Sequence, residues 1–539
     1  MTPVTMRPAA RTRTIATCVK EHAKPATTHR SLVLGILVST LLPLAVCGPT
    51  LGPWIEFSPD SFLYLRLGRT LIETGAFPAE RVTTPPGFPL LLAPLLAAGD
   101  LPLVGLRVLT GAAFIATCVL TFLLHRRWVG DRWAMLVAAL TATCPALLTQ
   151  SASLLSEIVF IPLTLLALIV LSRWKAEGLR GWGDAAGGGA AVAAAAMVRT
   201  MGLLLAPIAV WTAWRSGHGP IGRRLAQAGL VAAIAVGPSA AWQIRQSAYP
   251  RRHGYVDSLT LPRAGAGETT GGLGLQIDRL MRFGPQRMAD LKAALVPNRL
   301  CWQAFSGPLA TACTWAVGLA VVVLVGWRCA TQRLPGEMYV FLSAAVLAVW
   351  PWYEGERLVA PLVPIIYGSL IGAASRAWRA ASAGAVRASR RRRWFGWTGA
   401  AGAAIGVLLI VQAAECGLTV ASLGERGPVM QGRTAGMAEL GAWLATHHPA
   451  DDAVHAVVPK GTLAKLTLIG AGYLGRKTLV VDDAPAMNDL DKMDRPAECV
   501  LVHRSIARVA ARAWRRDSIG QSGEFVLLGP ATTVQNRAR

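Results

Sequence analysis

The sequence predicts an α-helical integral membrane protein with about eleven transmembrane helices and a small C-terminal α/β domain. The first observation is composition: 53% of the 539 residues are hydrophobic, 16% are charged and the mean hydropathy is +0.42, which excludes an ordinary soluble globule. The second is that long apolar runs alternate with short basic clusters. The third is that strand-like and helix-like pieces replace the apolar runs after residue 415.

The net charge of +24 comes from basic residues that fall in clusters between the apolar runs. No nucleic-acid-binding motif accompanies these clusters, so we expect no nucleic-acid partner. Residues 1–30 are basic and contain no signal-peptide cleavage site, which predicts a cytoplasmic N-terminus and a retained first span. The nine cysteines show no CxxC or Cys/His spacing that would bind zinc or form a redox pair.

Apolar runs of a length that can cross a bilayer occur between residues 31 and 415, and each predicts one transmembrane helix. They lie at 31–48, 103–124, 133–149, 153–172, 184–198, 201–215, 225–243, 308–328, 337–352, 358–374 and 396–415. A further run, 85–98, is short and contains four prolines, which favours an interfacial or re-entrant segment over a span.

The basic clusters decide the topology. If 85–98 does not cross, the clusters lie on the same side as the basic N-terminus, as the positive-inside rule requires. The loop 49–102, the tip 150–153, the loop 244–307 and the tail 416–539 then lie on the outer face. Arginine far outnumbers lysine and alanine is abundant, a composition typical of a GC-rich bacterial genome. We therefore expect a multi-pass plasma membrane protein with a transmembrane domain over 31–415.

The tail, 416–539, combines pieces with the character of helices and of strands, which predicts an extracytoplasmic α/β domain. The helix-like pieces are 437–448 and 505–514, and the strand-like pieces are 453–458, 477–483, 498–503 and 524–529. No glycine-rich phosphate-binding loop opens any of its helices, so we expect no cofactor in this domain.

Ionisable residues close to the outer ends of spans are the candidate functional residues. A charge near the membrane interior is costly, so a residue that carries one there is a candidate for function. Five stand out: Asp60, Glu157, Arg199, Arg245 and Arg357. Each also has a structural interpretation. An interfacial hydrogen-bonded acid would account for Glu157, and arginines at span ends often anchor a helix by extending to the interface.

The first of these acids lies in a predicted amphipathic helix over 60–74. Ser58 can cap this helix, Pro59 suits its first position, and Asp60 falls in its first turn, where the helix dipole favours a carboxylate. Gly75 is placed to end it. Helix capping and catalysis are therefore both open for Asp60 on this evidence.

The ordered set of motifs resembles the GT-C superfamily of polytopic glycosyltransferases, in the branch that contains protein O-mannosyltransferases and the lipid A aminoarabinose transferase. The segment SPDSFLYLRLGRTLIETGAF is similar to the family pattern D-x-x-x-Y-x-x-x-A-x-x-L-x-x-x-G, with Gly68 in place of alanine. The segments TPPGFPLLLAPL, SLLSEIVFIPLTLLAL, MVRTMGLLLAP, WQIRQ and ERLVAPLVPII follow in the family's order, so the resemblance covers nearly all of 30–415.

The resemblance implies an inverting transfer of a sugar from a polyprenyl-phosphate donor to an acceptor hydroxyl on the outer face. Asp60 matches the family's first-loop acid, which acts as general base or positions the acceptor. The resemblance implies that Glu157 holds acceptor or sugar hydroxyls or orients an arginine, and that Tyr64 binds substrate. It implies phosphate binding by three arginines, because guanidinium groups bind phosphate in a bidentate manner. These are Arg199, Arg245 and Arg357. The acceptor is a glycan, a lipid or a protein, and membrane lipids are further partners.

Some family members carry a second acid directly after the first-loop acid, whereas this sequence has Ser61 there and Glu56 before the motif. No histidine lies near either acid, so we expect no strict requirement for a divalent metal. Two other functions compete with the transferase. A polytopic lipid or solute transporter would place its charges near the bilayer midplane. A non-catalytic relative would act as a scaffold for envelope assembly through its tail.

Overall fold

The structure of the chain is a computed structural model that describes residues 29–447 apart from short gaps, together with five strands of the tail. The gaps are residues 49–51, 53, 79–81, 83, 100, 250–259, 261–271, 296–307, 352–354 and 388–390. The N-terminal segment 1–28 and the helix-like piece 505–514 lie outside the described residues.

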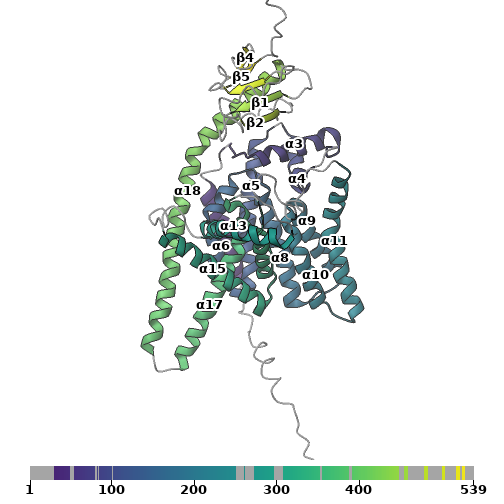
Figure 1. Ribbon diagram of the computed structural model, residues 1–539. Helices are drawn as coiled ribbons and strands as arrows, with labels where there is room; N and C mark the ends of the chain where they lie inside the picture. Colours follow the sequence, from purple (N-terminus) through teal and green to yellow (C-terminus); the bar gives the residue numbers. More distant parts are fainter. Residues whose placement is uncertain are drawn as a thin grey trace, which may run out of the picture.

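Helices make up the body of the molecule (Figure 1). In chain order they are α2 (His29–Cys47), α3 (Pro59–Thr74), α4 (Gly87–Leu96), α5 (Leu103–Val129), α6 (Asp131–Ala142), α7 (Pro145–Ser151), α8 (Ser156–Glu177), α9 (Trp182–Val198), η2 (Thr200–Leu204), α10 (Leu205–Ser216), α11 (Ile221–Ser247), α13 (Gly272–Leu295), α15 (Pro308–Gln332), α16 (Pro335–Ala348), η3 (Gly355–Leu358), η4 (Ala360–Leu362), α17 (Val363–Arg387) and α18 (Arg391–His447).

Each run that the sequence predicts as a span overlaps a helix of the structure. By length and composition, five helical stretches of the described chain could cross a membrane: α2, α5, α8, α11 and the part Trp315–Gln332 of α15. The predicted span 133–149 is not one straight helix, since α6 and α7 meet at 59°. Pro145 begins α7, and the residue before a proline disfavours helical geometry. The count of eleven spans stays a prediction.

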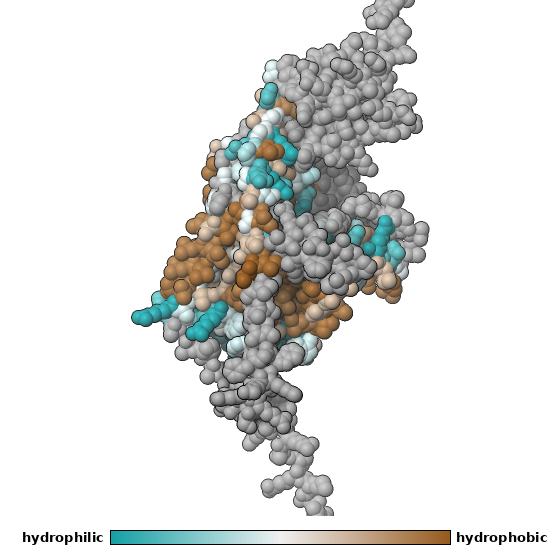
Figure 2. All heavy atoms as spheres, turned by 90° about the vertical axis from the view of Figure 1, so that its left-hand side faces the viewer, coloured by the Kyte–Doolittle hydropathy of each residue, from teal (hydrophilic) through white to brown (hydrophobic). Residues whose placement is uncertain are grey.

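The helical body exposes large apolar side chains. Leu34 and Leu41 of α2 and Ile244 of α11 are among them. Figure 2 shows hydrophobic residues gathered across the middle of one face, with hydrophilic residues above and below. Lipid covers such a band in a membrane, whereas a soluble protein buries it. The surface therefore agrees with the composition.

Small residues allow the helices of the body to approach closely. In α9, a Cβ atom on Gly188 would lie 2.1 Å from the ring of Trp174 in α8, and one on Gly189 would lie 3.0 Å from Ile234 in α11. Glycine removes these clashes, and close backbone approach is the usual way in which helices associate within a membrane. α9 is thereby held between α8 and α11.

The segment that follows α2 forms the helix that the sequence predicts. α3 has Ser58 as its N-cap, Asp60 in its first turn and Gly75 as its C-cap, with a left-handed φ of 71°. The Ser58 and Ser61 side chains bond to each other's backbone N–H in a capping box. Phe62 and Leu67 are both buried, so protein covers much of this helix.

The proline-rich run forms a short helix rather than a span. α4 contains ten residues and has Pro94 within it. At about 1.5 Å per residue it is roughly half as long as the hydrocarbon core is thick. α4 packs on α3 and on α9, and Figure 1 shows α3 and α4 at one end of the bundle, here named the α3 end.

Gly87 fixes the approach of α4 to α9. A Cβ atom there would lie 2.5 Å from the carbonyl oxygen of Met197, which is a backbone atom and cannot rotate away. We expect Gly87→Ala to destabilise the protein by about 1–3 kcal/mol, as overpacking does. The variant should have a lower midpoint of thermal denaturation than the wild type. Gly99→Ala is the control, because no heavy atom lies within 4 Å of the added Cβ; equal midpoints for both variants would contradict the contact.

α18 joins the bundle to the tail. It has 57 residues, and at about 1.5 Å per residue this is far longer than a membrane is thick. Figure 1 shows it rising beside α17, past the α3 end, to a sheet. The predicted helical piece 437–448 falls almost wholly within it.

Within the described residues, the sheet of the tail has five strands in the order β2-β1-β3-β5-β4. They are β1 (Val454–Val458), β2 (Leu479–Asp483), β3 (Val500–His503), β4 (Ser518–Ser522) and β5 (Phe525–Leu528). β1 is parallel to β2 and β3, with Ala456 opposite Val481 and Leu501, while β5 is antiparallel to β3 and β4. The sequence predicts four of these strands. It misses β4, whose residues SIGQS lack apolar alternation.

Candidate active site

Four of the predicted charged residues meet at the α3 end of the bundle, each from a different element. Asp60 stands in the first turn of α3 and Glu157 in the first turn of α8. Arg199 follows the last residue of α9 with an extended backbone, and Arg357 lies in η3. They are up to 297 positions apart in the sequence, so only the packing of the helices brings them together.

Glu157 is the centre of an ionic network. Its Oε1 pairs with the guanidinium groups of both Arg199 and Arg357. Arg357 also pairs through NH1 with Oδ2 of Asp60, at 2.7 Å. Glu157 is 0% exposed and Asp60 is 43% exposed. The network therefore runs from a fully buried carboxylate to one that external molecules can reach.

The two arginines explain why a carboxylate can be buried here. A buried charge is tolerated only when it is paired and hydrogen-bonded. Burial alone would lower the pKa of Arg357, but the charges of Glu157 and Asp60 raise it above its usual value. Arg357 is thus a cation that links the two acids.

A second chain of polar groups reaches Glu157 from α3. The Ser156 hydroxyl donates to Oε2 of Glu157 at 3.1 Å, and the Tyr64 hydroxyl lies 3.1 Å from the Ser156 oxygen. Because Ser156 has one proton and gives it to the carboxylate, Tyr64 is the donor in this pair. Burial and then the charge of Glu157 raise the pKa of Tyr64, which keeps its proton. Tyr64 thus helps to orient Glu157.

A largely apolar cavity of about 360 Å³ opens beside the network. Its polar lining comprises Asp60, Tyr64, Ser156, Arg199 and Arg357, together with Thr84 and Thr200. Apolar side chains from α3, α9, η2, α16 and η3 form most of the rest, namely Leu63, Val198, Met201, Leu203, Leu204, Val346, Leu347 and Leu358. A cavity with charges at one side and an apolar remainder suits a ligand that has a charged head and a hydrocarbon tail.

Arg245 does not join this network. Its NH2 donates to the carbonyl oxygens of Phe77 and Pro78, at 2.9 Å each, and its guanidinium lies over the rings of Trp242 and Tyr249. It connects the end of α11 to the loop between α3 and α4. The structure therefore brings together five of the six predicted site residues and leaves Arg245 at the loop.

Glu56 contacts residues outside this network. It accepts a bond from the Ser153 hydroxyl at 3.3 Å and lies 3.9 Å from Arg426 of α18. The backbone of Glu56 also pairs with Ala152 and Leu154, which attaches the chain before α3 to the turn after α7. Within the described residues, no three His, Cys, Asp or Glu side chains gather in a way that could hold a metal ion.

The sequence misses one polar residue of the site and another that supports a neighbouring turn. Ser156 joins Tyr64 to Glu157, and its position beside Glu157 is the only signal in the sequence. Arg107 of α5 is buried, donates to the carbonyl of Ser151 and lies 5.6 Å from the ring of Trp54. It supports the turn that leads into α8. The sequence does not show which carbonyl group an arginine inside an apolar run will contact.

Comparison with solved structures shows a similar fold in other proteins. The crystal structure of ArnT from Cupriavidus metallidurans bound to undecaprenyl phosphate matches with a TM-score of 0.53 and 14% identity, over 92% of this chain and 97% of that chain. The archaeal oligosaccharyltransferase AglB from Archaeoglobus fulgidus, in complex with an inhibitory peptide and a dolichol-phosphate, matches with a TM-score of 0.50 and 13% identity, over 94% and 74%. The chain has the GT-C fold.

This GT-C fold accounts for the helical body and for the apolar surface, and the chain is a multi-pass membrane protein. No protein-family model matches the sequence, and no curated protein matches it either. At 13–14% identity the likeness lies in the fold, so the activity has to be argued from the residues of the site.

Proposed function

We propose that this chain is a membrane glycosyltransferase. It transfers a sugar from a polyprenyl-phosphate donor to an acceptor hydroxyl at the outer face of the membrane. The observation that carries the proposal is the accessible carboxylate of Asp60, 2.7 Å from a guanidinium nitrogen of Arg357, at the side of an apolar cavity. The bound undecaprenyl phosphate of ArnT and the dolichol-phosphate of AglB support a lipid-phosphate donor.

The donor binds with its phosphate at Arg199 and Arg357 and its hydrocarbon chain in the apolar part of the cavity. Arginine suits this role because its planar fork matches two phosphate oxygens. A phosphate at Arg357 competes with Asp60 for the same guanidinium. Donor binding therefore releases Asp60 from its ion pair at the stage when a base is needed.

The reaction is a single displacement with inversion at the anomeric carbon. The acceptor oxygen forms the new bond to this carbon while the bond from the carbon to the phosphate oxygen breaks. Asp60 takes the proton of the acceptor hydroxyl as general base. The polyprenyl phosphate leaves as an anion, so it needs cations near it rather than a proton donor. Arg199 and Arg357 are those cations, and we propose no divalent metal.

The positive-inside rule supports a topology with the N-terminus in the cytoplasm and the tail outside. In this topology the α3 end, the site and the α/β domain of the tail all face the exterior of the plasma membrane. The proposed transmembrane domain has about eleven spans and includes α9, α10, α16 and α17 as short or tilted spans.

The test is release of free polyprenyl phosphate by the purified full-length chain in nanodiscs, with a panel of radiolabelled polyprenyl-phosphate sugars and a mixture of glycan, lipid and peptide acceptors. Release that depends on the protein supports the transferase. Failure of every donor with a folded protein would reject it and favour a transporter or a scaffold.

Arg199→Lys keeps the charge but loses the planar fork. We expect it to raise the KM for the donor and to lower kcat/KM by about 10- to 100-fold, since a charge-assisted bidentate contact is worth roughly 1.5–3 kcal/mol. The control is Arg173→Lys, which makes the same change in an exposed pair with Glu177 on α8. An unchanged KM for the Arg199 variant would remove Arg199 from phosphate binding.

A further inference from the structure

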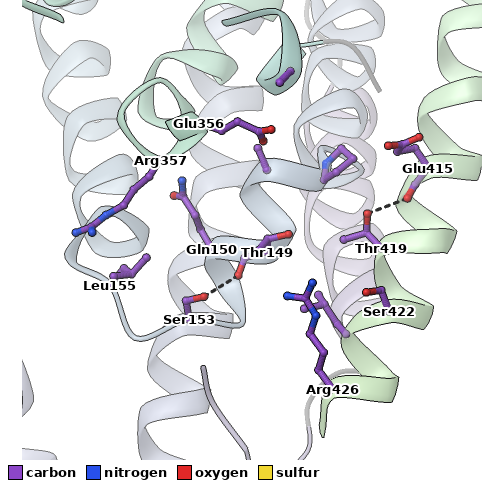
Figure 3. A pocket seen from close by; sticks show the side chains of 14 residues that line it. Thr149, Gln150, Ser153, Leu155, Glu356, Arg357, Glu415, Thr419, Ser422 and Arg426 are labelled. Carbon is purple, nitrogen blue, oxygen red and sulfur yellow. Dashed lines mark hydrogen bonds between the residues drawn. The ribbon is translucent and has the colours of Figure 1, made fainter. Parts of the chain in front are cut away.

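A second cavity, also of about 360 Å³, meets the first at Arg357. Leu155 faces the second cavity and the next residue, Ser156, faces the first, while Arg357 lines both. Figure 3 shows the guanidinium of Arg357 turned away from Glu356 and Gln150. Asp60 does not line the second cavity. We name it the polar cavity.

One wall of the polar cavity is a stripe on α18. Glu415, Thr419, Ser422 and Arg426 follow one another at intervals of four, three and four residues, so they share one face of the helix. Figure 3 shows all four on the side of α18 that faces the cavity. The opposite wall comes from Gln150 at the end of α7 and from Glu356 in η3.

Gln150 indicates a ligand. The residue is 6% exposed, and its Oε1 is buried with no hydrogen-bond partner. A buried acceptor without a partner costs about 1–3 kcal/mol. Gln150 lines the cavity, so rotation of its amide group would bring this acceptor to a hydroxyl group bound there.

The other polar groups suit a neutral ligand rather than an anion. Two carboxylates, Glu356 and Glu415, and two guanidinium groups, those of Arg357 and Arg426, line the cavity. Arg357 is already paired with Asp60 and Glu157, and Arg426 lies 3.9 Å from Glu56. Burial, and then the charges of Asp290 and Glu415, raise the pKa of Glu356, which favours its proton-donating form. The Thr419 hydroxyl donates to the carbonyl of Glu415, so its oxygen is presented as an acceptor.

We infer that the polar cavity binds a neutral sugar unit of the acceptor, and that the acceptor is therefore a glycan. Sugar hydroxyls both donate and accept, which matches the amide, carboxyl and hydroxyl groups of the two walls. The volume lies in the range of about 300–1,000 Å³ that is usual for ligand sites. Since Asp60 is absent from this cavity, the bound unit is not the one that reacts but a neighbour of it. The inference rests on the proposed transfer.

The experiment measures binding rather than turnover. The full-length chain in nanodiscs is titrated with methyl glycosides of common pentoses and hexoses, and separately with undecaprenyl phosphate, and tryptophan fluorescence or thermal denaturation reports binding. We expect Gln150→Leu and Thr419→Val each to weaken glycoside binding by about 10-fold, the effect of one lost hydrogen bond in a buried site. Undecaprenyl phosphate should bind as it does to the wild type. Thr331→Val is the matched control: Thr331 donates to the carbonyl four residues earlier, as Thr419 does, but lines neither cavity.

Each other outcome has a distinct meaning. Cleavage of the donor without binding of any glycoside would overturn the inference, while the proposed transferase activity would still hold. Glycoside binding that neither cavity variant weakens would overturn the inference as well, since the sugar would then bind elsewhere. Glycoside binding that a saturating polyprenyl-phosphate sugar abolishes would also overturn it, since the sugar would then occupy the site of the donor's sugar. Glycoside binding that needs Gln150, in a chain that neither binds nor cleaves any polyprenyl-phosphate donor, would support the sugar site and reject the proposed transfer.

Discussion

Asp60→Asn should lower the rate of polyprenyl-phosphate release by about 100- to 10,000-fold, the usual contribution of a general base. Asparagine has the same shape and can still receive a bond from Arg357, but it cannot take a proton from the acceptor hydroxyl. The measurement is release of free polyprenyl phosphate by the variant beside the wild type, at saturating donor. We expect the KM for the donor to change far less than kcat.

The structure separates this role from helix capping. The Ser58 hydroxyl accepts the capping bond from Ser61, and Ser61 returns one to the backbone of Ser58, so Asp60 contributes no cap. Its loss costs α3 only the dipole interaction, about 0.3–1 kcal/mol, and the Arg357 pair. Asp184→Asn is a matched control, because Asp184 is the first-turn acid of α9 and accepts a bond from the backbone of Arg180. If both variants lose the same small fraction of activity, Asp60 is not the base.

The sequence predicts the local features of the site well, because short-range rules determine them. The ends of α3 follow from Ser58 and Gly75, and the short α4 follows from its prolines. The positions of Asp60 and Glu157 near span ends indicate which charges to follow. These features depend on neighbours within a few residues, which a single sequence contains.

The pairing of the charges is not local and could not be predicted. Nothing in the sequence distinguishes Arg357, which pairs with both acids, from Arg245, which donates to the carbonyls of Phe77 and Pro78. Both are single arginines near the end of an apolar run. Only the packing of α11 against the loop after α3 and the position of η3 beside α8 separate them. For this reason phosphate binding by Arg245 stays a prediction of the sequence alone.

The polar cavity shows the same limit. Gln150 and Glu415 lie 265 positions apart and belong to segments that the sequence predicts as a loop tip and the end of a span. The stripe on α18 has helical spacing, but the same spacing would fit a helix whose polar face meets water. The unpartnered oxygen of Gln150 becomes visible only once the walls are assembled.

Glu157→Gln should reduce both stability and catalysis. The variant leaves Arg199 and Arg357 near the interior without their shared carboxylate, and breaking a buried ion pair in this way costs about 3–5 kcal/mol. Both arginines are partly exposed, so we expect the lower end of this range. The two cations would also lose the group that sets their spacing, and displacement of such groups by about 1 Å can lower a rate by about 100-fold.

The matched control for this change is Glu337→Gln. Glu337 is also buried, pairs with Arg328 at 2.6 Å and accepts a bond from Ser369, but it lines neither of the two large cavities. Both variants should therefore lower the midpoint of thermal denaturation, which removes general destabilisation as an explanation. Only Glu157→Gln should lose donor affinity and polyprenyl-phosphate release in the fraction that stays folded. If the folded Glu157 variant releases polyprenyl phosphate at the wild-type rate, then the network holds the helices together and does not position the phosphate, and the arginines that bind the donor have to be sought elsewhere.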